Sequence, residues 1–196
     1  MSKELQDWLE EMAKISYIKP EDIPNIDLYM DQVTTFLESA LAGTKRTPDD
    51  KIMTKTMINN YTKNKLLPPP EKKKYGKDHI FLLILIYYFK SFLSISDLQQ
   101  ILTPLSAYCF GQETTSKEDP DLAQVYKTLF ETSKTYYQQS KKDLEQLTEL
   151  SKSSFSEVEG EKGVFLEKMT LITLLSHDIY LRKKIIESMI DEMKEN

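Results

Sequence analysis

Residues 51–77 read KIMTKTMINNYTKNKLLPPPEKKKYGK, and this stretch determines the predicted fold. Thr54 is a good helix N-cap, and the segment from Lys55 to Leu66 contains neither Gly nor Pro, so a helix is predicted there. Pro68–Pro70 end that helix, because proline lacks a backbone N–H and restricts the residue before it. A lysine-rich segment, residues 70–77, follows directly.

The predicted helix has two different faces. At about 100° per residue, Met57, Ile58 and Tyr61 fall on one side, where they can pack on a core. The opposite arc carries cations, amides and a hydroxyl, from Lys55, Thr56, Asn59, Asn60 and Lys63. Such a face suits a nucleic-acid groove, because an asparagine amide matches the major-groove edge of adenine. Asn59 lies inside the arc and is expected to contact bases, whereas Asn60, at its edge, could equally face solvent.

Charge is distributed unevenly along the chain. The whole chain is formally −5, but residues 44–77 carry ten Lys or Arg and three acidic residues, which gives +7 there and −12 in the remainder. This asymmetry indicates a basic contact module on an otherwise acidic body. A solvated lysine-rich loop is the alternative, and the interleaving of lysines with a patterned helix favours the contact module.

The same stretch resembles the MerR family of bacterial transcription regulators, whose second helix typically reads TLRYYERIGLLPPP. The residues that match this helix are Ile58, Tyr61, Leu66, Leu67 and Pro68–Pro70, and Thr54 stands where the family has its helix-capping serine. The family has a small wing after the prolines, and Lys73, Lys74 and Tyr75 are similar to it. Residues 78–102 resemble its next helix pair, with the turn at residues 94–97. The whole chain also resembles a family of uncharacterised bacterial proteins known only as a domain of unknown function and described as MerR-like.

The resemblance implies a sequence-specific transcription regulator that binds double-stranded DNA through the helix 54–66 and the wing, residues 70–77. On that wing Lys72, Lys73 and Lys74 are expected to contact phosphates rather than base edges, and Tyr75 completes the predicted contact set. The chain differs from the family in its long connector, residues 44–53, in a shorter wing, and in having Asn59 and Asn60 where Arg and Tyr are common. A non-enzymatic protein–protein adaptor on a degenerate helix-turn-helix scaffold is the alternative function.

Composition predicts an all-α protein. Among 196 residues only five are Gly and 29% are charged. The single cysteine, Cys109, excludes an internal disulfide, fits a reducing cytoplasm and is expected to be a buried small residue. No signal peptide is recognisable at the start. The most apolar run, Ile80–Phe89, has about half the length of a membrane span, so we expect a buried helix and a cytoplasmic protein without a membrane partner.

The predicted organisation is a MerR-like module with an N-terminal helix (residues 1–110), a polar linker (111–119) and a helical dimerisation or effector region (120–196). Amphipathic spacing predicts helices near residues 2–15 and 27–42, and capping signals and stripes predict helices near residues 96–110 and 120–154. Continuous length without turn residues predicts a helix near residues 77–93, and a last helix is predicted after the polar break at 157–162. A buried strand is the competing interpretation for the apolar middle of residues 77–93.

The last helix carries an apolar heptad stripe. Its members are Phe165, Ile172, Ile179, Ile186 and Met193, supported by Leu175 and Met189. A seven-residue period predicts the seam of a coiled coil or bundle. The stripe could pack on residues 120–154 of the same chain or on a second chain. The two are compatible, and a homodimer is expected.

No arrangement for catalysis, metal binding or a cofactor is recognisable, so we expect no enzyme activity. His79 and His177 lie on separate predicted helices, and neither is close to Cys109 in sequence, whereas a metal site needs several convergent ligands. Phosphate loops, HExxH and nucleophile elbows are absent from the sequence. Seven aromatic residues could line a pocket for a small apolar effector, although such residues more often form a core. They are Tyr126, Phe130, Tyr136, Tyr137, Phe155, Phe165 and Tyr180.

Overall fold

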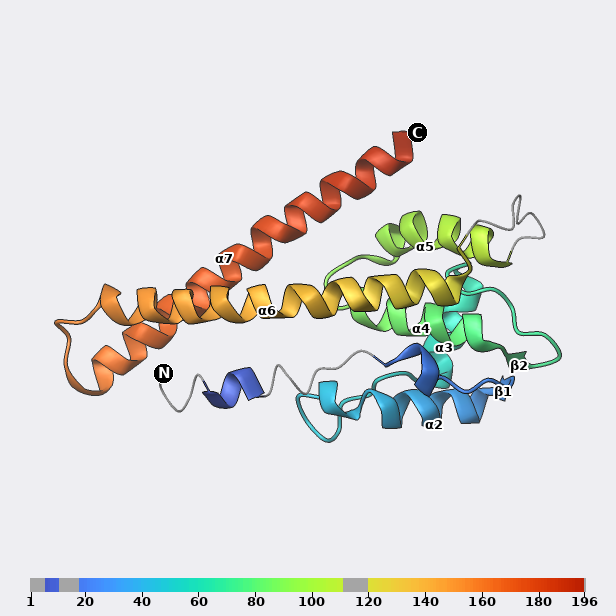
Figure 1. The fold of residues 1–196 in the computed structure, drawn as a ribbon, viewed down its shortest axis with the longest axis horizontal. Helices are drawn as coiled ribbons and strands as arrows, with labels where there is room; N and C mark the ends of the chain where they lie inside the picture. The colour runs from blue at the N-terminus through green and yellow to red at the C-terminus, as the bar shows by residue number, and fades with distance from the viewer. Residues whose placement is uncertain (1–5, 11–17, 111–119, 196) are drawn as a thin grey trace. The chain divides into compact units, whose positions relative to one another are not determined.

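The computed structural model describes residues 6–10, 18–110 and 120–195, which are mainly helical, with two short strands (Figure 1). This confirms the all-α prediction. Contacts divide the chain into two compact units, residues 14–131 and residues 1–13 with 132–196. The division falls inside a helix, not in the predicted linker at residues 111–119, which lies outside the described residues.

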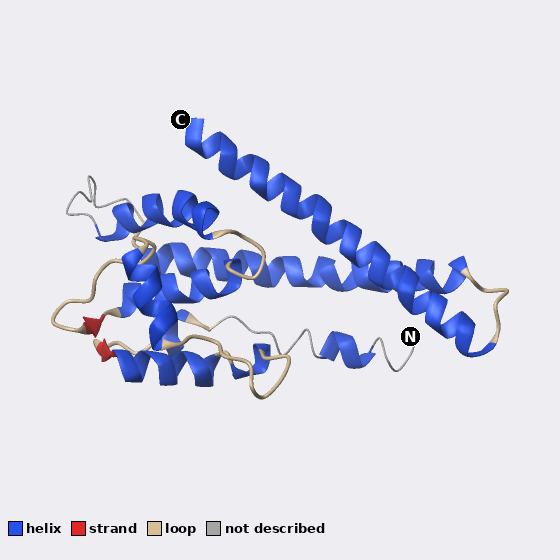
Figure 2. Cartoon of the chain, turned by 180° about the vertical axis from the view of Figure 1, so that it is seen from behind, coloured by secondary structure: helices blue, strands red, loops and turns tan. Residues whose placement is uncertain are grey.

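The first unit, residues 14–131, contains the basic stretch. Its helices are α2 (Met30–Ala40), α3 (Lys55–Lys63), α4 (Lys77–Phe89), α5 (Ile95–Phe110) and the first turns of α6 (Leu122–Ser154). Short 3-10 turns, η1 (Pro20–Asp22) and η2 (Ala42–Thr44), precede and follow α2. The strands β1 (Leu28–Tyr29) and β2 (Lys74–Tyr75) pair antiparallel, with Leu28 opposite Tyr75 and Tyr29 opposite Lys74 (Figure 2).

Helix α4 is the centre of this unit. Its side chains from His79 to Ile86 are all buried, and a helix that is apolar all round must be surrounded by other elements. The helix interpretation of this segment is therefore right, and the strand interpretation is wrong. Tyr126 of α6 packs on Phe81 with 4.7 Å between ring centroids and donates a hydrogen bond to the Ile18 carbonyl at 2.7 Å. The start of α6 therefore belongs to this core.

A capping box begins α5. The Ser94 hydroxyl accepts from the Asp97 N–H at 3.1 Å, and the Asp97 carboxylate accepts from the Ser94 N–H at 3.2 Å. This reciprocal pair satisfies two backbone donors at the helix start. Ser94 is therefore the N-cap of α5, one position before its first residue, Ile95.

The second unit is built on a hairpin of α6 and α7 (Gly160–Glu195). The turn between them needs glycine, because Gly160 has φ 75° and a Cβ on Gly163 would lie 1.9 Å from the Val158 carbonyl oxygen. Arg182 of α7 donates to the Tyr136 hydroxyl of α6 at 2.7 Å. Residues 6–10 are helical, and the rest of the predicted N-terminal helix lies outside the described residues.

None of the helices in the described part of the chain is long and apolar enough to cross a membrane.

Candidate nucleic-acid interface

Helix α3 separates its two faces as its sequence pattern predicts. The Thr54 hydroxyl accepts a hydrogen bond from the Met57 N–H at 3.2 Å, which fixes the start of the helix. Ile58 and Tyr61 are buried, at 0% and 7% exposed. The predicted contact residues of this helix are all exposed, namely Lys55, Thr56, Asn59, Asn60 and Lys63. Packing of the apolar face therefore holds the polar face outward.

The end of α3 is closed by a left-handed residue that is not glycine. Lys65 has φ 58°, and the N–H groups of Leu66 and Lys65 donate back to the carbonyls of Tyr61 and Thr62 at 2.9 and 3.1 Å. These two bonds form the Schellman pattern, in which glycine usually takes the left-handed position. The helix consequently ends at Lys63, three residues before the predicted end.

The wing, residues 70–77, is organised by a two-residue turn. The Lys74 N–H donates to the Glu71 carbonyl at 2.8 Å, and the central residues Lys72 and Lys73 have φ 47° and 67°. Positive φ at both central residues is the feature of the type I′ hairpin turn, where Asn-Gly is preferred. Lysine adopts it at a cost of about 1–3 kcal/mol per residue, and such strain concentrates at functional sites.

Strand pairing holds the wing beside the start of α2. Lys74 lies opposite Tyr29, and its ammonium group is 5.3 Å from the centroid of the Tyr29 ring, a cation–π contact. Lys74 is therefore half-buried, whereas Lys72 and Lys73 are exposed at the tip. Of the three predicted phosphate contacts, the two tip lysines are the accessible ones.

Tyr75 does not belong to the exposed contact set, which corrects the prediction. Its side chain is 3% exposed and packs edge-on against the His79 ring, with 5.5 Å between centroids. Burial raises the pKa of its hydroxyl. Successive residues of a strand point to opposite faces, so Tyr75 points into the core from a strand whose previous residue, Lys74, points outward. Tyr75 therefore stabilises the wing by packing against the core.

His79 connects the wing to α4. Its Nδ1 accepts a hydrogen bond from the Gly76 N–H at 3.2 Å, so the imidazole is neutral in this arrangement. Burial lowers the pKa of His79 below its ordinary value, and the Pro69 carbonyl and nearby carboxylates act in the opposite direction. A protonated Nδ1 could not accept from Gly76.

Asp31 and Tyr29 also belong to this region, and the sequence did not predict them. Asp31, in the first turn of α2, forms an ion pair with Lys55. Both side chains are more than half exposed, so the pair contributes little stability. Tyr29 lies under Lys74 as described above. Both partners come from the segment before the basic stretch, and no local sequence pattern pairs them with it.

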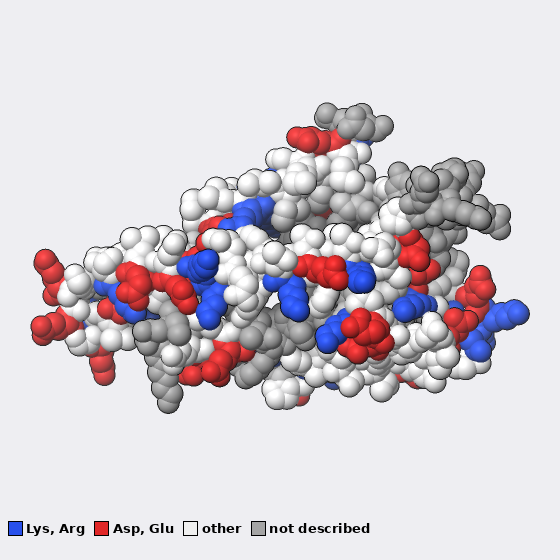
Figure 3. Space-filling view, viewed as in Figure 1, with Lys and Arg blue, Asp and Glu red and all other residues white. Residues whose placement is uncertain are grey.

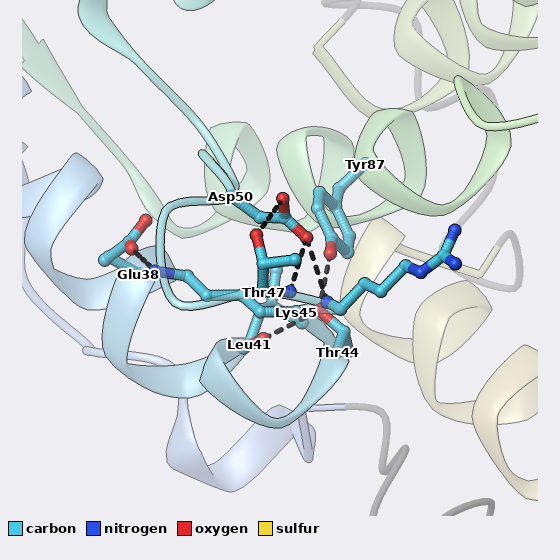
Figure 4. A network of polar contacts seen from close by, with 8 residues as sticks. Glu38, Leu41, Thr44, Lys45, Thr47, Asp50 and Tyr87 are labelled. Atoms are coloured by element: carbon cyan, nitrogen blue, oxygen red, sulfur yellow. Dashed lines mark hydrogen bonds and ion pairs between the residues drawn. The ribbon is translucent and has the colours of Figure 1, made fainter.

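The long connector between α2 and α3 is an ordered structure (Figure 4). The Asp50 carboxylate accepts from the Thr47 hydroxyl at 2.7 Å and from the Thr47 and Arg46 N–H groups at 3.0 and 2.9 Å, and these bonds lower its pKa. The Thr44 hydroxyl donates to the Leu41 carbonyl at 2.7 Å and shares a hydrogen bond with the Tyr87 hydroxyl of α4.

The connector is also attached to the core at its far end. Ile52 and Met53 are buried, at 1% and 3% exposed, and the Lys90 ammonium donates to the Ile52 carbonyl at 2.9 Å. The connector thus delivers Thr54 to a fixed position, from which α3 begins.

At the end of the first unit beside β2, basic side chains lie exposed next to acidic ones (Figure 3). In the same view, acidic and basic side chains alternate along α6, so no single sign dominates on that helix. The excess of +7 is a property of residues 44–77 as a segment of the sequence.

The heptad stripe of α7 is largely uncovered in the single chain. Most of its members are 51–63% exposed, namely Phe165, Ile172, Ile179, Met189 and Met193, while Leu175 and Ile186 are half-buried. The apolar side chains that recur from Phe165 to Met193 of this 36-residue helix form a surface that a partner can bury.

The aromatic residues considered for an effector pocket separate into different environments. Tyr126 belongs to the core of the first unit, at 2% exposed. Tyr136 lines a cleft between α6 and α7, whereas Phe155, Phe165 and Tyr180 are exposed outside it. The side chain of Cys109 lies outside the described residues. Within the part of the chain that the structure describes, no three His, Cys, Asp or Glu residues are grouped to hold a metal ion.

The fold and the surface described so far define a helical protein with a capped helix and a basic wing exposed on one compact unit. Residues 18–129 match the family model described as Domain of unknown function (DUF1836). The match covers more than half of the chain, so the chain belongs to this family. It also covers most of the compact unit of residues 14–131, including the start of α6. Neither the curated proteins nor the solved structures contain a match to the chain.

Proposed function

We propose that this protein is a sequence-specific DNA-binding transcription regulator of the MerR-like type. In this proposal α2 and α3 form the helix-turn-helix, the β1–β2 pair and residues 70–77 form the wing, and α4 and α5 are the helix pair that follows. The role is non-enzymatic. The observation that carries the proposal is the outward polar face of α3 beside a strained lysine turn in the same compact unit.

Base recognition is assigned to α3. Asn59 is exposed in the interior of the polar arc, and its planar amide can bond the N7 and N6 edge of adenine. Lys55 and Lys63 flank it and can reach either guanine or a phosphate. The buried side chains of Ile58 and Tyr61 fix the rotation of α3 about its axis. A fixed rotation is needed for Asn59 to contact the bases of one particular DNA sequence.

Phosphate contact is assigned to the wing. Lys72 and Lys73 hold two adjacent cations at the end of a short turn, and their backbone strain, of about 1–3 kcal/mol each, lowers the stability of the fold. A turn sequence selected for stability alone would carry Asn-Gly here. The two lysines are consistent with selection for charge at that position.

A homodimer through α7 completes the proposal. The heptad stripe is apolar at five successive seven-residue positions from Phe165 to Met193 and is largely exposed, and a second copy presents the same stripe. A twofold dimer would place two α3 helices for adjacent half-sites on DNA.

An adaptor without DNA binding is the second candidate. The ion pair of Lys55 with Asp31 favours it, because a carboxylate at the start of α2 offsets one of the cations expected to meet DNA. The two functions differ in their response to salt, since only phosphate contact releases counterions.

Binding of the full-length protein to duplex DNA, followed by fluorescence anisotropy over a salt series, separates the two candidates. A regulator binds with log affinity that falls by about 0.9 per phosphate contact for each unit of log salt. A control variant replaces Lys134 and Lys142, two exposed lysines of α6 outside the proposed interface, with Ala. We expect this variant to show the same slope of log affinity against log salt as the parent protein. Absence of binding at low salt, or a flat slope, contradicts DNA binding and supports the adaptor.

A further inference from the structure

A cleft in the second unit is separate from the surface assigned to DNA. It has a volume of about 610 Å³ and lies between α6, α7 and the side chain of Trp8. Its apolar walls come from Trp8, Leu144, Leu147, Leu171, Ile172 and Leu175. Cavities of about 300–1,000 Å³ with mainly apolar walls are typical of small-molecule sites.

The segment that carries Trp8 is attached to the hairpin. The neighbouring residue Leu9 is 5% exposed, and its carbonyl accepts a hydrogen bond from the Tyr137 hydroxyl of α6 at 3.2 Å. Trp8 itself is 39% exposed, so one part of its ring forms a wall of the cleft while another part meets solvent.

Charged groups at the edge of the cleft balance one another. Arg182 donates through Nε to both carboxylate oxygens of Asp178, at 2.8 and 2.9 Å, and also bonds the Tyr136 hydroxyl. Asp143 accepts from Gln139 at 2.7 Å, and Lys168 is the remaining charged residue of the lining. Two acidic and two basic residues leave no net charge to attract an ion.

We propose that this cleft binds a small, uncharged and largely apolar molecule. The apolar walls favour burial of a hydrocarbon or aromatic body, and the balanced rim offers an ionised ligand no compensation for losing its hydration. The hydroxyl of Tyr136 and the paired side chains beyond it supply the few polar contacts that orient such a ligand.

The cleft shares two residues with the heptad stripe, and this link rests on the proposed homodimer. Ile172 and Leu175 line the cleft and also belong to the stripe of α7. A molecule that covers them removes them from the helix pair, so ligand binding and dimerisation oppose each other. The coupling is reciprocal, and a dimer binds the ligand more weakly by the same factor.

Trp8 provides a direct test, because it is the only tryptophan in the chain. The probe is N-phenyl-1-naphthylamine, an uncharged fluorophore that accepts energy from a nearby indole. Titration into the full-length protein should quench Trp8 and sensitise probe emission with saturation at one site. The Trp8→Phe variant should abolish the sensitised emission. The sulfonated analogue 1-anilinonaphthalene-8-sulfonate should bind more weakly, and equal binding would overturn the assignment of an uncharged ligand.

A matched pair of variants locates the site. Leu147 lines the cleft, whereas Leu150, one turn further along the same helix, is 52% exposed and outside it. Leu147→Gln should lower probe affinity about tenfold, because the amide must lose its hydration, while Leu150→Gln should leave it unchanged. Circular dichroism checks that both variants fold. Equal loss in both variants, or in neither, overturns the site.

Sedimentation with and without saturating probe tests the coupling. At a probe concentration that just saturates the parent protein, the probe should raise the dimer dissociation constant of the parent and of Leu150→Gln, and it should raise that of Leu147→Gln much less, because this variant binds the probe about tenfold more weakly. A dimer dissociation constant that is the same with and without bound probe overturns the proposed competition for Ile172 and Leu175. A chain that binds the probe at Trp8 but never dimerises contradicts the proposed homodimer and the coupling, and it supports the ligand site.

Discussion

Helices α4 and α7 are both rich in apolar residues, but their side chains meet opposite surroundings. From Ile80 to Ile86, no side chain of α4 is more than 6% exposed. On α7, Phe165, Ile172 and Ile179 are 56–63% exposed. Apolar surface stabilises a fold only when it is removed from water, so the unit of residues 14–131 completes its core within one chain and α7 does not.

This difference separates two kinds of recognition. A unit with a finished core presents mainly polar groups, and α3 with its wing offers amides and cations from a rigid support. A helix with an unfinished apolar stripe offers hydrophobic area instead. The comparison supports the proposal that the first unit recognises DNA and that α7 self-associates, and substitutions confined to one of the two regions test each part of the proposal separately.

The largest effect is expected from a core deletion in α4. Phe81 is 0% exposed and packs on Tyr126, so Phe81→Ala should lower the free energy of unfolding by about 3–5 kcal/mol. The same change at Phe165, which is 61% exposed, should cost less than about 0.5 kcal/mol at a concentration where the chain is monomeric. Urea titration measures both, and equal costs would remove the contrast between the two helices.

The next effect should appear in the oligomeric state. Ile179→Asp places a charge in the proposed seam and should weaken the dimer by roughly 2 kcal/mol, or about 30-fold in dissociation constant. Ser176→Asp, on the same helix but outside the stripe, is the control and should leave the dimer intact. Sedimentation over a concentration series compares them. Only monomer for the parent protein at micromolar concentration would refute the seam.

A pH-dependent loss of stability is expected from His79. Its pKa is lowered in the fold by burial, so below the ordinary pKa of about 6.5 the unfolded chain binds a proton that the folded chain does not. Stability should therefore fall on acidification from about pH 7.5 to 5.5, by at most about 1.4 kcal/mol per pH unit. The carboxylates near the ring, which limit the shift, are Asp78, Asp27 and Glu71.

Two variants separate His79 from other titrating groups. His79→Gln should remove the fall in stability within this pH window, whereas His177→Gln, at an exposed position on α7, should keep it. Thermal unfolding in matched buffers gives the comparison. A pH profile that is identical in both variants would assign the effect to another group.

The smallest effect on stability should come from the wing, and its sign is opposite to its effect on binding. The double variant Lys72→Asn, Lys73→Gly supplies the preferred type I′ pair and should raise the free energy of unfolding by about 1 kcal/mol. It also removes two cations, so the slope of log DNA affinity against log salt should become shallower by about 2. Lys65→Gly relieves similar strain outside the contact set and should stabilise without changing that slope. Loss of stability together with unchanged binding would contradict both roles of the turn.

Local signals in the sequence predict the beginnings of the elements well. Thr54 before a run without Gly or Pro predicts the start of α3, because an N-cap side chain bonds a backbone N–H two or three residues further along the chain, and the helix predicted near residues 96–110 begins at Ile95. The end of α3 is different. Glycine at the left-handed position is the usual sequence signal for a Schellman closure, and here that position is Lys65. The predicted helix therefore extends three residues too far.

The misplaced and missed residues share one physical cause. Tyr75 is inside and Lys74 outside because β2 pairs with β1, more than forty residues earlier, and a two-residue strand has too little alternation to predict its faces. The ion pair of Asp31 with Lys55 likewise joins two elements distant in sequence, α2 and α3. The boundary of the first unit depends on the burial of Tyr126, a contact across the core that composition does not predict.

The most direct test of the account is the effect of Asn59→Ala on sequence choice. A preferred site is first selected from a random duplex library with the full-length protein, and affinity is then measured on that site and on random DNA. The account predicts a loss of about 1–3 kcal/mol on the preferred site and much less on random DNA, with a smaller difference for Asn60→Ala. An equal loss on both DNAs, or no loss on either, would show that α3 does not read the sequence.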